Sequence, residues 1–315
     1  MTLLSSSGSA SMATPGNSES NSAQDRLPVL AVVGVGLIGG SFAAALRARG
    51  AVSQVLGVGR QASTLTRARE LGLIDEAVSL EDAAARADLI FLAVPVGAMP
   101  ALLSQLAPVL REGTLVTDGG STKADVARAA RQALGARALQ FVPGHPVAGK
   151  ESTGPEAADA GLYDRRTVVL TPLPENREAD VERLTHWWEA CGARVLRMEP
   201  EVHDRVLASV SHVPHLLSAV YMRQVASASD ADTRLRLAGS GFRDFTRISA
   251  GSPEMWRDIF LANRAAVLAE VAEVRGVLDH VERALRAQDG PALQDFLERA
   301  ALARRLWGGR RGETD

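Results

Sequence analysis

The chain has 315 residues, with 35 Lys and Arg against 37 Asp and Glu, a formal net charge of −2 and a pI near 6.3. This balance lacks the basic field by which nucleic-acid-binding domains attract phosphates, so we expect no nucleic-acid partner. No apolar run reaches the roughly 20 residues of a membrane-spanning helix, and a single cysteine, Cys191, excludes a disulfide framework. These features predict a cytoplasmic protein of two domains without a membrane partner.

Residues 1–25 are rich in serine and nearly uncharged, which predicts a disordered tail and no secretory signal. After this tail, short apolar runs alternate with helical patterns up to about residue 197. The expected strands are 28–33, 54–58, 88–94, 114–117, 140–142, 167–170 and 193–197, and the expected helices are 41–49, 63–71, 100–110, 124–134 and 179–191. Such alternation predicts one mostly parallel sheet joined by right-handed crossovers.

The pattern changes near residue 199, where the strand signals stop. From residue 203 to residue 306, Ala, Leu, Arg and Val recur at helical spacing. The predicted fold is therefore an α/β Rossmann-type dinucleotide-binding domain at residues 26–197, followed by an all-α helical domain at residues 198–307 and a short tail at residues 308–315.

A glycine-rich turn follows the first strand and opens the first helix. Gly34, Gly36 and Gly39 match the G-x-G-x-x-G fingerprint in the strand–turn–helix context that the fingerprint requires. The first glycine makes the tight turn, the second lets the backbone approach a pyrophosphate, and the third allows helix–strand packing. We expect a dinucleotide at these glycines and at Leu37 and Ile38, where the helix begins. The alternative is a tight turn that binds nothing.

The end of the second strand bears on the choice of dinucleotide. Gly59 stands where NAD-binding domains carry an acid that holds the ribose hydroxyls. Arg60 offers a guanidinium to a 2′-phosphate, and Ser63 offers a further hydrogen bond. The pattern favours NADP as the cofactor, with NAD as the alternative. In a chain so rich in arginine, Arg60 is alternatively a solvated surface residue.

Ligands of open α/β sheets bind at the carboxyl ends of the strands. Val94 and Pro95 follow one strand there and are expected to line the cofactor, and two further loops follow at residues 118–123 and 143–152. His145 lies in the last loop, flanked by prolines that restrict its backbone. An imidazole that titrates near neutrality is suited to accept a proton as hydride leaves a substrate.

Six segments together carry a family resemblance. They read GVGLIGGS, DGGSTK, HPVAGKE, SHVPH, GFRDFTRI and MWRDIFLANR, and they lie in order between about Leu27 and about Val274. In this set the chain resembles the prephenate dehydrogenase family of tyrosine biosynthesis, which includes arogenate and cyclohexadienyl dehydrogenases. The resemblance implies a Rossmann-type domain with a helical dimerisation domain, a homodimer, and metal-free oxidative decarboxylation of prephenate or arogenate with NAD or NADP.

The resemblance also implies roles for individual residues. His145 is then the catalytic histidine on the ring hydroxyl of the substrate, Ser121 contacts the same hydroxyl and the nicotinamide, and Glu151 lies in a loop that gates the site. The matching substrate-binding positions in the helical domain are His203, His215 and Arg247, with Asp244 and Trp256 nearby.

Lysine is nearly absent from the chain. Of the 35 cationic residues 33 are Arg, and the two lysines are Lys123 and Lys150. Both fall in the loops predicted at the carboxyl edge of the sheet. We expect Lys123 beside the cofactor and Lys150 beside the substrate, at the mouth of the site, because a compact ammonium suits such a place better than a wide planar guanidinium.

Several of these residues have structural alternatives. His212 is expected to be a packed, hydrogen-bonded core histidine. A zinc site at His203, His212 and His215 is disfavoured, because the spacing matches no metal motif. Asp244 and Arg247 form either a simple helical ion pair or a pair that orients the guanidinium toward substrate.

Two other functions stay open from the sequence. A β-hydroxyacid or 6-phosphogluconate type of dehydrogenase places a catalytic lysine in its helical domain, and this chain has no lysine there. A catalytically silent NADP-sensing protein would have a degraded site, whereas Ser121, His145 and Arg247 are all present.

Overall fold

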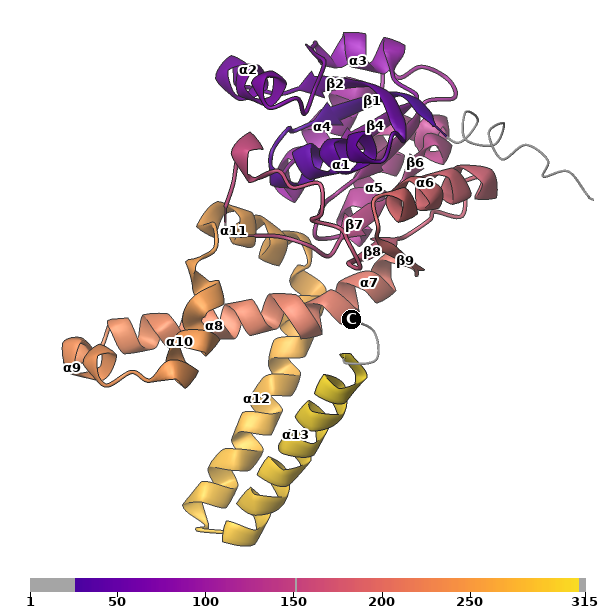
Figure 1. Ribbon diagram of the computed structural model, residues 1–315. Helices are drawn as coiled ribbons and strands as arrows, with labels where there is room; N and C mark the ends of the chain where they lie inside the picture. The colour runs from indigo at the N-terminus through magenta and orange to yellow at the C-terminus, as the bar shows by residue number, and fades with distance from the viewer. Residues whose placement is uncertain (1–25, 151, 312–315) are drawn as a thin grey trace, which may run out of the picture.

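The computed structural model describes residues 26–150 and 152–311. The predicted disordered tail at residues 1–25 lies outside them. An α/β part, coloured from indigo to rose, is followed by a helical part in orange and yellow (Figure 1). The two parts meet where strand β9 (Arg194–Arg197) leads into helix α7 (Pro200–Leu207). The predicted combination of a Rossmann-type fold and an all-α region is confirmed.

A parallel sheet of six strands forms the centre of the α/β part. Its order is β3-β2-β1-β4-β5-β6, the doubly wound order of dinucleotide-binding folds. The strands are β1 (Leu27–Val33), β2 (Val52–Val58), β3 (Glu76–Ala77), β4 (Leu89–Leu92), β5 (Leu115–Asp118) and β6 (Phe141–Val142). Because the strand order reverses between β1 and β4, the loops after these two strands diverge, and ligands bind at such a point.

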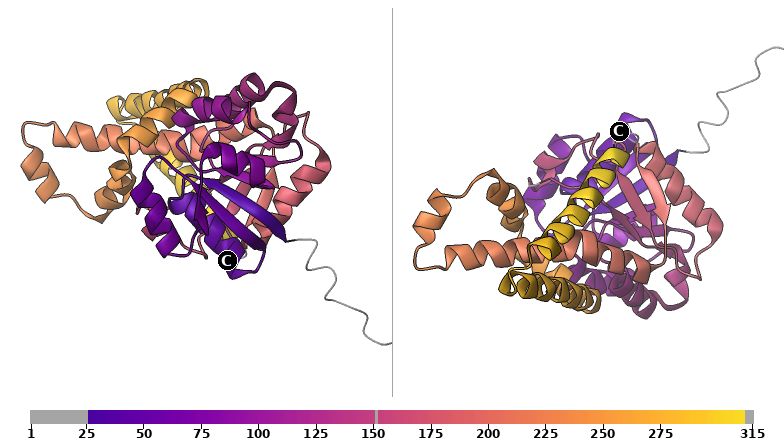
Figure 2. Two further views of the ribbon diagram at one scale, coloured as in Figure 1. Left: turned by 90° about the horizontal axis from the view of Figure 1, so that it is seen from above. Right: turned by 90° about the horizontal axis from the view of Figure 1, so that it is seen from below.

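Helices cover both faces of this sheet (Figures 1 and 2). They are α1 (Leu37–Ala48), α2 (Ala62–Glu70), α3 (Leu80–Arg86), α4 (Met99–Leu106), α5 (Ala124–Leu134) and α6 (Glu178–Ala190). On one face the rings of Phe42, Phe91 and Trp188 pack with centroids 4.4 to 5.6 Å apart. Coverage of both faces explains why strands such as β4 are continuous apolar runs and are buried along their length.

Residues 167–170 and 194–197 form strands, but not in the main sheet. They are β8 (Thr167–Leu170) and β9, and they form a second sheet with β7 (Gly144–Pro146) in the order β7-β8-β9. The prediction that they complete the main sheet is therefore wrong. Pro143 has no N–H for a ladder, and the N–H of Gly144 donates to Asp118 (3.1 Å). The chain thus leaves the main sheet after Val142, and β8 pairs antiparallel with β7 instead.

The helical part consists of one long rod and several shorter elements. Its elements after α7 are the π-helical turn η4 (Ala208–His212), α8 (Val213–Ala226), α9 (Ala231–Arg236), α10 (Ser240–Thr246), the 3₁₀ helix η5 (Arg247–Ala250), α11 (Pro253–Ala262), α12 (Arg264–Arg286) and α13 (Gly290–Arg311). Helix α13 continues past residue 307, where the sequence predicts a tail. No helix among the described residues has the length and apolar content that crossing a membrane requires.

The helical rod made of α7, η4 and α8 is irregular in its middle because of Pro214. Pro214 has no N–H, so the regular hydrogen bond to the fourth residue before it is missing and the ladder rearranges into a π-helical turn. The rod carries three buried histidines, His203, His212 and His215. Turns of this kind are frequent at functional sites.

Helix α11 joins the helical part to the α/β part. It packs on the 3₁₀ helix η1 (Val96–Ala98), which follows β4. Ile259 of α11 is buried in the same apolar cluster as Val96. The carboxyl edge of the main sheet is therefore covered by residues from both parts of the chain.

Candidate active site

The glycine-rich turn has the geometry that a dinucleotide phosphate requires. Gly34 has a φ of +95°, and a Cβ there would lie 2.4 Å from the carbonyl oxygen of Ala93. A Cβ on Gly39 would lie 2.3 Å from the carbonyl oxygen of Gly34. A Cβ on Gly36, at the N-cap of α1, would instead meet nothing within 4 Å. The open space lies at a helix N-terminus without an acidic residue in its first turn, which suits an anion.

The residues expected at the adenosine end lie together where β2 meets α2. Gly59, Arg60 and Ser63 are all exposed, between the end of β2 at Val58 and the first turn of α2. A Cβ on Gly59 would lie 3.3 Å from the side chain of Leu65. This edge therefore offers a guanidinium and a hydroxyl, with no carboxylate at the position that selects NAD.

Lys123 does not lie at the mouth of the site. Its side chain is 0% exposed and forms an ion pair with Asp118 at the end of β5. The ammonium also donates to the carbonyl oxygen of Gly144 (2.7 Å), and the Asp118 carboxylate accepts from the N–H groups of Gly120 (2.8 Å) and Gly144. Burial raises the pKa of Asp118 against the opposing effects of Lys123 and these N–H groups. The expectation that Lys123 lies at the mouth of the site is wrong, because its ammonium is enclosed in this pair, which joins the β5 loop to β7.

His145 lies on β7, beside the loop that follows β5. Its ring is 8% exposed, and Nδ1 lies 2.8 Å from Nε2 of His203 on α7. Burial lowers the pKa of His145 well below its ordinary value of 6.5, and the charges of His203, Lys123 and His212 lower it further. The ring is therefore neutral at pH 7 and is able to accept a proton.

His203 has both ring nitrogens occupied by protein groups. Besides the contact with His145, its Nδ1 lies 2.8 Å from Oδ1 of Asp204. The side chain is fully buried. The structure therefore places His203 behind the catalytic candidate, and contact of its side chain with substrate stays a prediction. Asp204, which sequence reasoning missed, is the partner that completes this cluster.

His215 and Trp256 lie together, as expected of neighbouring substrate positions. Their rings stack with centroids 3.5 Å apart and an interplanar angle of 15°. The turn after η5 is packed against both rings, because a Cβ on Gly251 would lie 2.7 Å from the Trp256 indole nitrogen and 3.2 Å from the His215 ring. Arg247, which is exposed, begins η5, and η5 packs on α8. The structure thus brings these three substrate-side candidates into one region.

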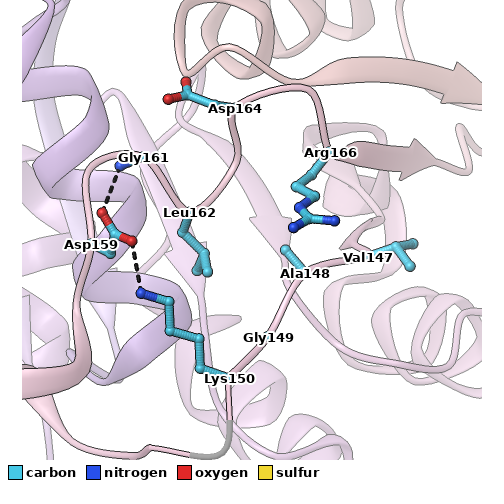
Figure 3. A pocket seen from close by; sticks show the side chains of 9 residues that line it. All are labelled: Val147, Ala148, Gly149, Lys150, Asp159, Gly161, Leu162, Asp164 and Arg166. Atoms are coloured by element: carbon cyan, nitrogen blue, oxygen red, sulfur yellow. Dashed lines mark hydrogen bonds and ion pairs between the residues drawn. The ribbon is translucent and has the colours of Figure 1, made fainter. Parts of the chain in front are cut away.

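The remaining candidate site residues lie in the loops that follow β4, β5 and β7. Ser121 is partly buried in the loop between β5 and α5, and Val94 and Pro95 follow β4. Lys150 is 46% exposed, is ion-paired with Asp159 (2.7 Å), and lines a separate pocket of about 440 Å³ (Figure 3). Glu151 lies outside the described residues.

His212 is a core histidine, as the sequence predicts. It is 1% exposed, and its Nδ1 lies 3.1 Å from Nδ2 of Asn263, which also donates to the carbonyl oxygen of Asp204 (2.8 Å). Burial lowers the pKa of His212 to about 4. Among the described residues, no group of three or more His, Cys, Asp and Glu side chains could hold a metal ion.

A Rossmann-order sheet, an open glycine turn and a buried neutral imidazole define a class of protein. This combination, completed by a helical second part, is that of a dinucleotide-dependent oxidoreductase. Two family models match the chain: the nucleotide-binding domain of prephenate dehydrogenase at residues 42–197, and the dimerization domain of prephenate dehydrogenase at residues 199–299. The chain belongs to the prephenate dehydrogenase family, and the family predicted from the sequence is confirmed.

Individual relatives agree with this assignment. The chain is 34% identical to the cyclohexadienyl dehydrogenase of Zymomonas mobilis over 87% of this chain and 94% of that protein, and 34% identical to the prephenate dehydrogenase of Bacillus subtilis over 85% and 73%. The crystal structure of Aquifex aeolicus prephenate dehydrogenase with hydroxyphenyl propionate and NAD⁺ is 33% identical, with a TM-score of 0.83 over 88% of this chain and 97% of that one. The Synechocystis arogenate dehydrogenase is 32% identical, with a TM-score of 0.77 over 89% and 99%.

Proposed function

We propose that the chain catalyses the oxidative decarboxylation of prephenate or arogenate, with NAD(P) as the hydride acceptor. The observation that carries the proposal is His145: a buried, neutral imidazole at the carboxyl edge of a dinucleotide-binding sheet. Membership of the prephenate dehydrogenase family and a relative solved with hydroxyphenyl propionate and NAD⁺ support the same chemistry.

His145, Ser121 and Arg247 then have distinct roles in the reaction. His145 removes the proton of the ring hydroxyl while hydride leaves the same carbon, and Ser121 holds that hydroxyl by a hydrogen bond. The bound nicotinamide ring takes up the hydride. Loss of CO₂ from the opposite ring carbon leaves the electron pair that makes the ring aromatic, so no metal is required. Arg247 binds a substrate carboxylate, beside the stacked pair of His215 and Trp256.

The test crosses both substrates with both cofactors. Purified protein is mixed with prephenate or arogenate and with NAD or NADP, and the absorbance of the reduced cofactor is followed. We expect reduction with at least one of the four pairs. An absence of reduction with all four would refute the enzymatic function and leave the silent NADP-sensing protein as the better description.

The preference for NADP is part of the proposal, and it rests on the exposed Gly59 and Arg60 at the end of β2. Gly59→Asp is expected to raise kcat/KM for NAD relative to NADP, because a carboxylate accepts hydrogen bonds from the ribose hydroxyls and repels a 2′-phosphate. The neighbouring Leu65 lies 3.3 Å from the new Cβ, so a small shift accommodates it.

The measurement is the ratio of the two kcat/KM values in wild type and variant. Asp82, exposed at the start of α3, gives a matched control: Asp82→Gly changes a surface carboxylate elsewhere in the same domain and is expected to leave the ratio unchanged. An unchanged ratio in Gly59→Asp would contradict the preference for NADP without affecting the proposed reaction.

A homodimer formed through the helical part is also proposed. Helices α8, α12 and α13 extend away from the α/β part (Figures 1 and 2) and expose large apolar side chains. The most exposed of them include Val220, Leu268, Leu278, Leu285 and Leu297. Such apolar faces are typical of subunit interfaces, and the matching family model is a dimerization domain.

A further inference from the structure

We infer that His203 and Asp204 are positioning residues that fix the tautomer of His145 and make its Nε2 the atom that accepts the proton. The inference rests on the proposed function, because it concerns the same base. It departs from the sequence expectation for His203, which placed that side chain against the substrate.

The tautomers of His145 and His203 follow from the hydrogen bonds that join these two rings to Asp204. A carboxylate only accepts hydrogen bonds, so Nδ1 of His203, 2.8 Å from Oδ1 of Asp204, carries the proton. In a neutral His203 ring, Nε2 is then the unprotonated nitrogen, and it accepts from Nδ1 of His145 over 2.8 Å. The proton of the neutral His145 ring is thereby assigned to Nδ1. Its Nε2 keeps a lone pair and has no hydrogen bond to any residue within the described ranges.

Asp204 is itself held in a fixed place. Its Oδ1 also accepts from the N–H of Lys123 (2.8 Å), and its Oδ2 accepts from the N–H of Ala124 (3.0 Å), at the start of α5. Burial alone would raise the pKa of Asp204, but the hydrogen bonds from His203 and from these two N–H groups outweigh burial and lower it. The carboxylate is therefore ionised at pH 7 and is an acceptor on both oxygens.

The hydrogen-bonded line of Asp204, His203 and His145 also stabilises the charge that the reaction creates. Proton transfer to His145 creates a positive charge in a buried place, where burial and the positive charge of Lys123 oppose it. Asp118 is already paired with Lys123. Asp204, acting through the shared hydrogen bonds of His203, is the negative group aligned with the new imidazolium. Both positioning residues come from α7, whereas His145 comes from β7.

The variants separate positioning from packing. Asp204→Asn removes the negative charge and leaves one acceptor oxygen for the three donors that the carboxylate serves, so it no longer fixes the tautomers of His203 and His145. We expect kcat to fall by about 10²- to 10⁴-fold with little change in KM, since general-base catalysis is worth this much. His203→Leu, which leaves the Asp204 bonds to α5 intact, is expected to lower kcat similarly. His203→Gln keeps an acceptor for the Nδ1–H of His145 and is expected to retain more activity than His203→Leu.

The pH profile provides a readout that packing alone would not change. Removing the negative charge of Asp204 destabilises protonated His145, so the acid limb of kcat is expected to move to lower pH in Asp204→Asn. The matched control is His212→Asn: it replaces another buried histidine of the same rod, keeps an acceptor for Asn263, and is expected to leave kcat near wild type.

Nitrogen-15 NMR of the histidine rings tests the tautomers in the protein without substrate. We expect protonation at Nδ1 of both His145 and His203 in the wild type, and a proton shared between Nδ1 and Nε2 of His145 in Asp204→Asn. Wild-type kcat in His203→Leu, or protonation of His145 at Nε2 in the wild type, would overturn the inference. If the wild type reduces neither cofactor with either substrate, the proposed function fails, while the NMR result still decides the tautomers.

Discussion

His145→Asn is expected to lower kcat by about 10²- to 10⁴-fold while KM changes little. Asparagine is close in size to the imidazole and keeps an N–H to donate toward His203, so the surroundings of β7 are preserved. The amide oxygen is far too weak a base to take a proton at pH 7, so the chemical step loses its acceptor. Steady-state kinetics with the substrate and cofactor preferred by the wild type measure the effect.

His186→Asn is the control for this substitution. His186 is exposed on α6, and its replacement is expected to leave both kcat and KM unchanged. Binding of the cofactor to His145→Asn, followed by fluorescence, is expected to match the wild type and excludes misfolding as the cause. A variant that turns over at the wild-type rate would show that another group removes the proton.

Lys123→Met is expected to lower the free energy of unfolding by about 3–5 kcal/mol. The substitution removes the only side-chain cation that pairs with Asp118 among the described residues and leaves a carboxylate buried without a counter-charge. The carbonyl oxygen of Gly144 loses a donor as well. Denaturant and thermal unfolding of the protein without ligands measure the loss.

The other lysine is the natural control. Lys150→Met breaks an ion pair with Asp159 in which both side chains are nearly half exposed, so the expected loss is below about 1 kcal/mol. The double variant Asp118→Asn/Lys123→Met removes the unpaired charge and is expected to be more stable than Lys123→Met alone. Equal losses for Lys123→Met and Lys150→Met would contradict the importance of the buried pair.

The fold was predictable because its signals are local. A glycine turn between an apolar run and a helix, followed by further alternation, identifies the Rossmann-type fold, and the structure shows this topology. The second sheet was not predictable in this way. Its separation depends on one proline and on the bond from the Gly144 N–H to Asp118, a partner 26 residues away. Nothing in residues 167–170 distinguishes a strand of one sheet from a strand of the other.

The candidate site was predictable in its members more than in their roles. His145 was identified by its place at the carboxyl edge of the sheet, and His212 by its apolar surroundings. Asp204 carried no signal, because adjacent residues on a helix do not face one another and its bonds to Lys123 and Ala124 join positions some 80 residues apart. The scarcity of lysine did mark a structurally important residue in Lys123, although its ammonium is enclosed with Asp118.

Asp204 belongs to the helical part but accepts hydrogen bonds from backbone N–H groups at the start of α5, in the α/β part. The proposed proton transfer therefore depends on the packing of the helical part against the α/β part. Residues up to about 197 contain the glycine turn and His145, so cofactor affinity and the base are both encoded before α7 begins. Only when α7 has docked does the imidazole acquire its partner. The oxidation chemistry thus requires both parts of the chain, since the residues up to about 197 carry the base without the carboxylate that orients it.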